Sequence, residues 1–135
     1  MTAGDIVKET GLIIEEFTVK ANEDVEKGEV VYNDGNGILA ASSTAKGPFY
    51  VALEDHDYSA KTTHKVRCVV RGQVKAQKKS GAAIKKGQFT EISTTDGEVT
   101  VFDYTTPGNW YDVVGEAMED VADTATEVTT LVGKQ

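Results

Sequence analysis

Short runs rich in apolar, strand-forming residues recur along the chain, and in some of them the apolar residues stand at alternate positions. In the stretch 66–70, Val66, Cys68 and Val70 fall on one face of an extended chain. Because successive side chains of a strand point to opposite faces, this alternation predicts a strand with that face in the core. Comparable runs rich in Val, Ile, Thr, Phe and Tyr are Phe17–Val19, Glu29–Tyr32, Phe49–Leu53 and Glu98–Phe102.

Turn-forming residues separate these runs at short intervals. They are Asn33–Gly37, Lys46–Pro48, Arg71–Gly72, Ser80–Gly81, Asp96–Gly97 and Pro107–Asn109. Asn, Asp, Gly and Pro supply the backbone angles that tight turns and hairpins require. Short strands at this spacing predict an all-β fold, either a small barrel or a sandwich.

Segments of the first half recur in the same order in the second half. Val25–Val30 resembles Ile84–Phe89, which begins 59 residues later (84 − 25). The other pairs are Val51–Asp55 with Glu116–Asp120 and Val66–Val70 with Val128–Val132. An internal duplication is therefore predicted, with pseudo-repeats over residues 21–75 and 80–135.

The stretch 114–128 fits two structures. A helical stripe is formed by Val114, Met118, Val121, Ala125 and Val128. The internal repeat instead favours a strand, an acidic turn and a second strand, and the local periodicity alone does not decide between them.

At 135 residues the chain fits one domain, since two independent cores would each be small. Residues 1–10 lack apolar alternation, which predicts a flexible N-terminal arm followed by a single β domain over residues 11–135. The arm either docks onto a partner or is simply a frayed terminus.

Composition excludes several classes of protein. The single cysteine, Cys68, excludes an intrachain disulfide framework and a multi-thiolate zinc site. A net charge of -8 argues against a nucleic-acid partner, because phosphate contacts need a basic surface. The longest apolar runs, such as Leu12–Ile14, are too short to cross a bilayer, so no membrane partner is expected either.

Charge is segregated along the chain. Residues 58–90 contain nine basic residues and no acid, whereas residues 91–135 contain ten acids and one base. The two stretches either pair, within a subunit or between copies, or form a solvated surface of mixed charge. The basic side chains with the clearest potential as interface contacts are Lys78, Lys79, Lys85 and Lys86.

An aromatic pair adds a second candidate contact. Trp110 and Tyr111 follow the turn at 107–109. They either pack in the core or anchor an interface, since Trp and Tyr are enriched among binding hot spots.

Catalytic and metal-binding motifs are not found in the sequence. His56 and His64 are the two histidines, and neither belongs to a recognisable metal motif. The serines lack the glycine pattern of a nucleophile elbow, and the glycine-rich turn 34–37 lacks the features of a phosphate-binding loop. We therefore expect no enzymatic activity, no cofactor and no bound metal, with His64 at the surface and Cys68 buried.

Several short elements resemble two known groups of proteins. Like biotinyl and lipoyl carriers, the chain has a Gly-Gln step before a strand, at Gly87-Gln88, but its hairpin 92–97 lacks the lysine that a carrier modifies. Lys-Gly steps at Lys27-Gly28 and Lys86-Gly87, the turn and strand 35–40, and the Ala-x-Glu-Asp element in Val51–Asp55 resemble the capsid decoration, or cement, proteins of tailed viruses, including the lambda-type head decoration proteins.

The second resemblance implies a β-clip-like fold and a protein without an active site. Such a protein is made in the host cytoplasm and binds the outer surface of the capsid lattice, often as a homotrimer. Its partners would be the major capsid protein and copies of itself. The alternatives are a carbohydrate- or small-ligand-binding β module of a phage tail or cell surface, and an enzyme fragment whose active site lies on another chain.

Overall fold

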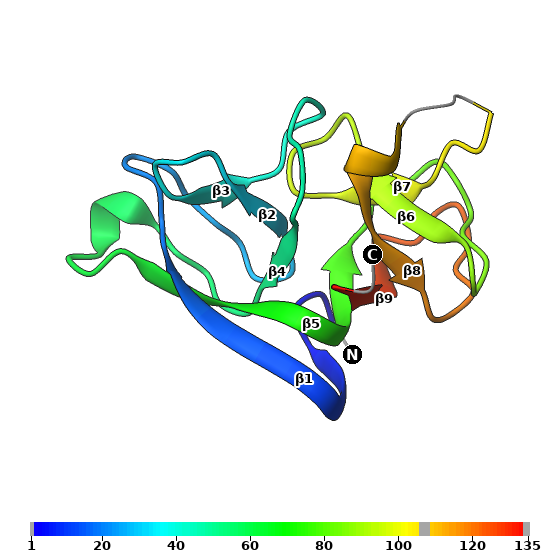
Figure 1. Cartoon of the computed structure of the whole chain (residues 1–135), viewed down its shortest axis with the longest axis horizontal. Helices are drawn as coiled ribbons and strands as arrows, with labels where there is room; N and C mark the ends of the chain where they lie inside the picture. Colours follow the sequence, from blue (N-terminus) through cyan, green and yellow to red (C-terminus); the bar gives the residue numbers. More distant parts are fainter. Residues whose placement is uncertain (1, 106–108, 134–135) are drawn as a thin grey trace.

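The computed structural model describes residues 2–105 and 109–133, without the side chains of residues 109 and 110. The strands are β1 (Ile6–Thr18), β2 (Val30–Asn33), β3 (Ile38–Ala40), β4 (Tyr50–Ala52), β5 (Lys65–Gln77), β6 (Phe89–Ile92), β7 (Val99–Val101), β8 (Val113–Ala117) and β9 (Glu127–Val132). Two short 3-10 helices, η1 (Tyr58–Ala60) and η2 (Asn109–Asp112), complete the elements of the described residues (Figure 1).

All nine strands belong to one antiparallel sheet that curls into a half-barrel. The strand order is β3-β2-β4-β5-β9-β8-β6-β7, and β1 pairs with β5 outside this path. The all-β prediction is confirmed. The stretch 114–128 forms a strand, a turn and the start of a second strand, as the internal repeat favoured, because its residues complete β8 and begin β9.

The sheet consists of two units with the same pairing pattern. In the first unit β2 pairs with β3 and β4, and β4 pairs with β5. In the second unit β6 pairs with β7 and β8, and β8 pairs with β9. Figure 1 shows the first unit on the left, the second on the right and β5 running through both.

Connections outside the strands repeat as well. The isolated bridges Val25–His56 and Val19–Ile38 of the first unit correspond to Ile84–Val121 and Lys78–Val99 of the second. The turn before β2 is closed by the Glu26 N–H, which donates to Glu29 Oε1 at 2.7 Å. In the second unit the Lys85 N–H donates to Gln88 Oε1 at 2.8 Å. The segments Val25–Val30 and Ile84–Phe89, which resemble each other in sequence, therefore occupy equivalent positions in the two units.

Strand β5 supplies side chains to two hydrophobic cores. Val66 and Cys68 belong to a small core that also contains Val19, Val25, Val31, Ile38 and Ala52. Val69 and Val74 belong to a large core that spans both units and includes Val30, Phe49, Val51, Ile84, Ile92, Val99, Val114, Val128 and Val132.

The change of core requires a change of face within β5. Ile13 pairs with Arg71 and Ile14 pairs with Val69, so the ladder skips Val70. Such a bulge reverses the inward and outward positions of the strand. Strict alternation wrongly placed Val70 inside and Val69 outside: Val69 is fully buried, and Val70 is half-buried.

The first strand begins earlier than the expected domain boundary. Residues 6–10, which the sequence analysis assigned to an arm, are part of β1, and Ile6 pairs with Val74. The Gly4 N–H donates to the Lys75 carbonyl at 2.5 Å, and the Lys75 N–H donates to the Asp5 carbonyl at 2.9 Å. Backbone pairing of this kind does not require apolar alternation, which is why the pattern missed it.

Candidate functional site

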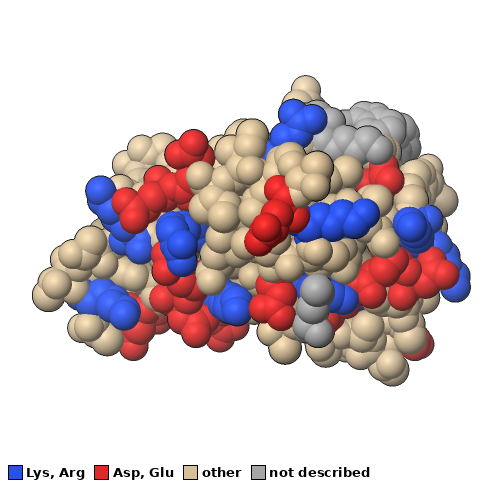
Figure 2. All heavy atoms as spheres, turned by 90° about the horizontal axis from the view of Figure 1, so that it is seen from below, with Lys and Arg blue, Asp and Glu red and all other residues tan. Residues whose placement is uncertain are grey.

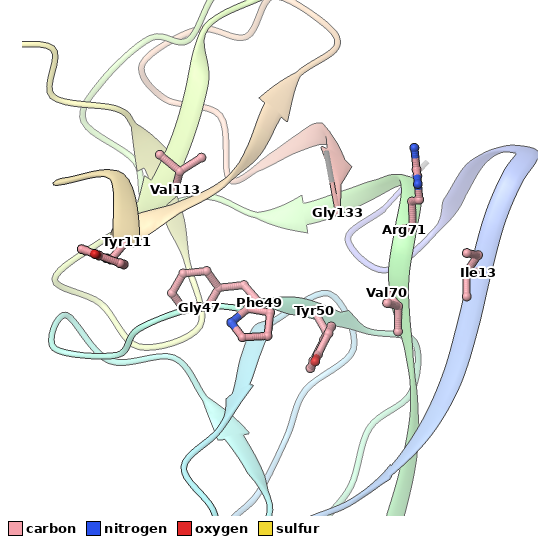
Figure 3. Close-up of a pocket in the computed structure, with 10 residues that line it drawn as sticks. Ile13, Gly47, Phe49, Tyr50, Val70, Arg71, Tyr111, Val113 and Gly133 are labelled. Atoms are coloured by element: carbon pink, nitrogen blue, oxygen red, sulfur yellow. The ribbon is translucent and has the colours of Figure 1, made fainter. Parts of the chain in front are cut away.

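A groove of about 440 Å³ lies where the two units meet. It is lined by Ile13, Gly47, Pro48, Phe49, Tyr50, Val70, Arg71, Tyr111, Val113 and Gly133. Figure 3 shows Ile13 and Arg71 on one side, Tyr111 on the opposite side, and Phe49 and Tyr50 between them. The groove is therefore assembled from β1, β5, the loop before β4, and the segment from η2 to β8.

Buried aromatic packing fixes the floor of the groove. Phe49 is buried in the large core, and the ring of Tyr50 stacks on Phe17 with 4.6 Å between ring centroids. The bulge in β5 turns Val70 out of the core, which places its side chain in the groove. The floor is thus a continuation of the folded core and does not depend on a ligand to form.

The two rims expose large apolar side chains. Tyr111 is 72% exposed and Ile13 is 45% exposed. The Gly47 N–H donates to the Tyr111 carbonyl at 3.3 Å, and Lys46 forms an ion pair with Asp112 at 3.2 Å, so the rim that carries Tyr111 is tied to the loop before β4. Exposed apolar side chains around a preformed groove are typical of a surface that binds another molecule.

Arg71 is the one charged residue that lines the groove. Within the described part of the chain, no hydrogen bond or ion pair joins its guanidinium to a neighbour. An arginine at the edge of an apolar groove can bind a carboxylate through two parallel hydrogen bonds. The groove is therefore suited to an apolar group flanked by an acidic one.

The four predicted lysines occupy different environments. Lys78 is 1% exposed, and its ammonium donates to the carbonyls of Lys79, Asp123 and Ala125. The prediction that Lys78 is an interface contact is therefore wrong, because this buried side chain closes a loop of its own chain and does not reach a partner's surface. Lys79 is half-buried and donates to the hydroxyl of Thr94. Of the four lysines, only Lys85 and Lys86 are exposed.

The aromatic pair is described in part. Tyr111 lies exposed at the groove rim, so of its two interpretations, packing in the core does not apply and an interface anchor stays a prediction. The side chain of Trp110 lies outside the described residues.

The segregated charges of the sequence do not form separate patches on the face shown in Figure 2, where basic and acidic side chains are interspersed. In the part of the chain that the structure describes, one ion pair joins the basic and acidic stretches: Lys75 pairs with Glu119, which also accepts hydrogen bonds from Thr129. Desolvation raises the pKa of Glu119, but the hydrogen bonds from Lys75 and Thr129 together outweigh it, so the pKa lies below its ordinary value. The pairing within a subunit is therefore realised at this position.

The two histidines meet in the fold, which the sequence did not predict. His56 Nε2 and His64 Nδ1 are 3.0 Å apart, and the ring of Tyr58 stacks on His64. His56 is buried, and desolvation lowers its pKa. Among the described residues, no three His, Cys, Asp or Glu side chains converge on a common point where they could hold a metal ion.

Cys68 is buried as predicted, and burial raises its pKa to about 12.

The fold and the groove together define a class: a small all-β protein whose curled antiparallel sheet is made of two similar units that share one long strand. Among solved structures, the N base of the head fiber gp8.5 of bacteriophage phi29 has a similar fold, with a TM-score of 0.56. The match covers 89% of this chain and 94% of that chain at 19% sequence identity.

Sequence comparisons add no closer similarity. No protein-family model matches the chain, and no curated protein sequence matches it significantly. Among the described residues, no helix has the length and apolar character that crossing a membrane requires.

Proposed function

We propose that the protein is a structural component of a tailed-virus particle that binds the outer surface of the capsid and stabilises the shell. The observation that carries this proposal is the similarity in fold to a phage head fiber base over nearly the whole of both chains. The exposed apolar groove between the two units supports it, because such a surface serves binding and needs no catalytic group. We propose accordingly that the protein has no enzymatic activity.

The proposed partner is the major capsid protein. An apolar side chain of the shell would enter the groove between Ile13 and Tyr111, and a carboxylate beside it would bind Arg71. Many copies on one shell would reinforce each other, so each contact can be modest. The homotrimer implied by the resemblance to cement proteins remains a prediction.

The groove is tested by substitution of its exposed aromatic rim. We expect Tyr111→Ser to weaken co-sedimentation with purified expanded capsids by about tenfold or more, because a buried aromatic anchor contributes on the order of 2 kcal/mol to an interface. The matched control is Tyr104→Ser, since Tyr104 is 57% exposed and lies outside the groove. Melting curves of both variants verify the fold, since the Tyr104 hydroxyl accepts a hydrogen bond from the Phe89 N–H. Equal binding by the two variants would exclude the groove as the contact.

The groove also favours a second candidate function, a small-ligand-binding module of a phage tail or cell surface. Its volume falls within the range of roughly 300–1,000 Å³ that is usual for small-molecule sites. Aromatic side chains such as Tyr111 stack well on sugar rings. Saturable binding of a defined oligosaccharide that Tyr111→Ser abolishes, together with no binding to capsids, would favour this function.

A further inference from the structure

The outer edge of β1 is a long strand edge without a neighbour among the described residues. β1 spans 13 residues and pairs with β5 alone. Near its middle, Ile13 and Ile14 are 45% and 36% exposed. An unpaired edge with exposed apolar residues readily accepts another strand, and natural proteins usually protect such edges.

The terminal strands at the two ends of the sheet are protected differently. β3 and β7 have three residues each. Each is bridged on a second side, β3 by Val19 and β7 by Lys78. The open edge of β1 is therefore a specific feature and not a general property of this fold.

The internal repeat shows which edge of the second unit is equivalent to the outer edge of β1. Phe17 of β1 pairs with Val66, and at the equivalent place in the second unit Ala76 of β5 pairs with Val128. Residues 72–77 of β5 therefore occupy the position in the second unit that residues 13–18 of β1 occupy in the first unit. The outer edge of β5 near Val74 corresponds to the outer edge of β1 near Glu15.

In the second unit, the first residues of β1 cover this edge of β5. Ile6 pairs with Val74 and Lys8 with Gln73, and backbone hydrogen bonds at Lys75 continue the ladder to Gly4 and Asp5. Around Glu15 the equivalent edge of the first unit has no such strand among the described residues. The same strand position is occupied in one unit and open in the other.

We infer that the outer edge of β1 around residues 13–16 binds an extended segment of a partner protein, which joins the sheet as an antiparallel strand. The inference rests on the proposed function, in that the partner is the shell protein. Charge determines the chemistry of the segment. Glu15 and Glu16 lie on opposite faces of the edge, and Glu16 already forms an ion pair with Lys65 at 3.9 Å, so a basic side chain of the segment lies beside Glu15 and apolar side chains cover Ile13 and Ile14.

A second copy of this chain fits the edge poorly. Antiparallel pairing of two β1 strands centred between residues 15 and 16 would place Glu15 of one copy directly opposite Glu16 of the other, and pairing centred on residues 13–16 would set the same two side chains diagonally across the strand pair. Like charges facing each other across a strand pair are destabilising, and the net charge of -8 adds to the repulsion. The acidic residues thus act against self-association and in favour of a basic partner strand.

Hydrogen exchange in the presence of purified expanded capsids tests the inference directly. We expect amides of residues 13–18 that point away from β5 to exchange at least tenfold more slowly in the complex, because they become hydrogen-bonded to the added strand. We also expect Glu15→Lys with Glu16→Lys to weaken capsid binding by tenfold or more. The control, Asp96→Lys with Glu98→Lys, makes the same change in net charge at a distant turn and should bind as the wild type does.

The outcomes separate the inference from the proposed function. If the wild-type protein does not bind capsids, the proposed function and the inference both fail. If it binds, but the β1 amides exchange unchanged and the double variant binds normally, the inference alone is wrong. If the β1 amides are already protected in the protein alone and the mass corresponds to a dimer, the occupant is a second copy and the inference is overturned.

Discussion

At the scale of single residues, Glu29 gives the clearest pH-dependent contribution to stability. Its carboxylate accepts a hydrogen bond from the Glu26 N–H and lies against Gly97. Desolvation by burial, assisted by nearby acids, raises its pKa to about 7. At the equivalent place in the second unit, Gln88 makes the same hydrogen bond with an uncharged amide.

We predict that Glu29→Gln stabilises the protein above pH 7 and has little effect below pH 4.5. The folded state keeps the Glu29 proton up to about pH 7, whereas the unfolded chain loses it near its ordinary pKa of 4.5. Stability from this group is therefore present below pH 4.5 and is lost as the pH rises to about 7. The gain above pH 7 should be about 1–2 kcal/mol, less than the full shift implies because the side chain is partly exposed.

Urea unfolding of the wild type and of Glu29→Gln across this pH range measures the effect. Gln88→Glu is the matched control, because it places a carboxylate in the equivalent turn, and it should lose stability as the pH rises. A stability difference between Glu29→Gln and the wild type that does not vary with pH would contradict the assignment.

Lys78 illustrates a charged side chain used for structure. Its buried ammonium donates to the carbonyls of Lys79, Asp123 and Ala125 at 3.0, 3.4 and 3.2 Å. We predict that Lys78→Met destabilises the protein by about 1–3 kcal/mol, because three carbonyls of the loop lose the donor that joins them. Exposed Lys85→Met should change stability by less than about 0.5 kcal/mol. Equal unfolding midpoints for the two variants in a denaturant titration would show that Lys78 is dispensable.

At the scale of elements, runs rich in β-branched and aromatic residues between turn signals predicted strands that lie in cores. The runs 29–32, 49–53 and 98–102 correspond to β2, β4 and β7. Alternation failed in β5, since a bulge at Val70 cannot be seen in one strand alone: it exists only in the pairing with β1. The repeat resolved β8 and β9 because it compares whole units and not one local period.

The groove could not be predicted from the sequence. Its residues come from segments far apart in the chain, and only Tyr111 carried a signal, as an aromatic residue beside a turn. The meeting of His56 and His64 depends likewise on how the loop between β4 and β5 folds back. A basic stretch, in contrast, was easy to see and misleading at Lys78, because sequence does not report burial.

The N-terminal strand yields a prediction at this scale. Deletion of residues 1–10 removes the pairing of Ile6 with Val74 and the ion pair of Asp5 with Lys27. We expect a loss of about 1–3 kcal/mol in unfolding free energy, since several backbone hydrogen bonds are lost at about 1 kcal/mol each. The exposed β5 edge should also promote self-association, visible as a higher mass in light scattering. A truncated protein that is monomeric and as stable as the full chain would mean that these residues contribute no structure.

At the scale of the whole molecule, two similar units form one sheet around the shared strand β5, and the groove lies at their junction. The large core contains residues of both units, so the groove keeps its shape only while the units stay together. With the groove and the β1 edge as its two proposed docking features, the molecule is suited to joining neighbouring surfaces of a shell. Binding to the assembled shell and not to its separated subunits stabilises the shell by an amount that rises with the logarithm of the concentration of free protein.

The most direct measurement of the central claim is calorimetry of purified expanded capsids with and without saturating protein. We predict saturable binding and a rise in the temperature at which the shells dissociate, and a smaller rise with Tyr111→Ser at the same concentration. Shells that dissociate at the same temperature with and without the wild-type protein, or that show no saturable binding, would contradict a role in stabilising the capsid.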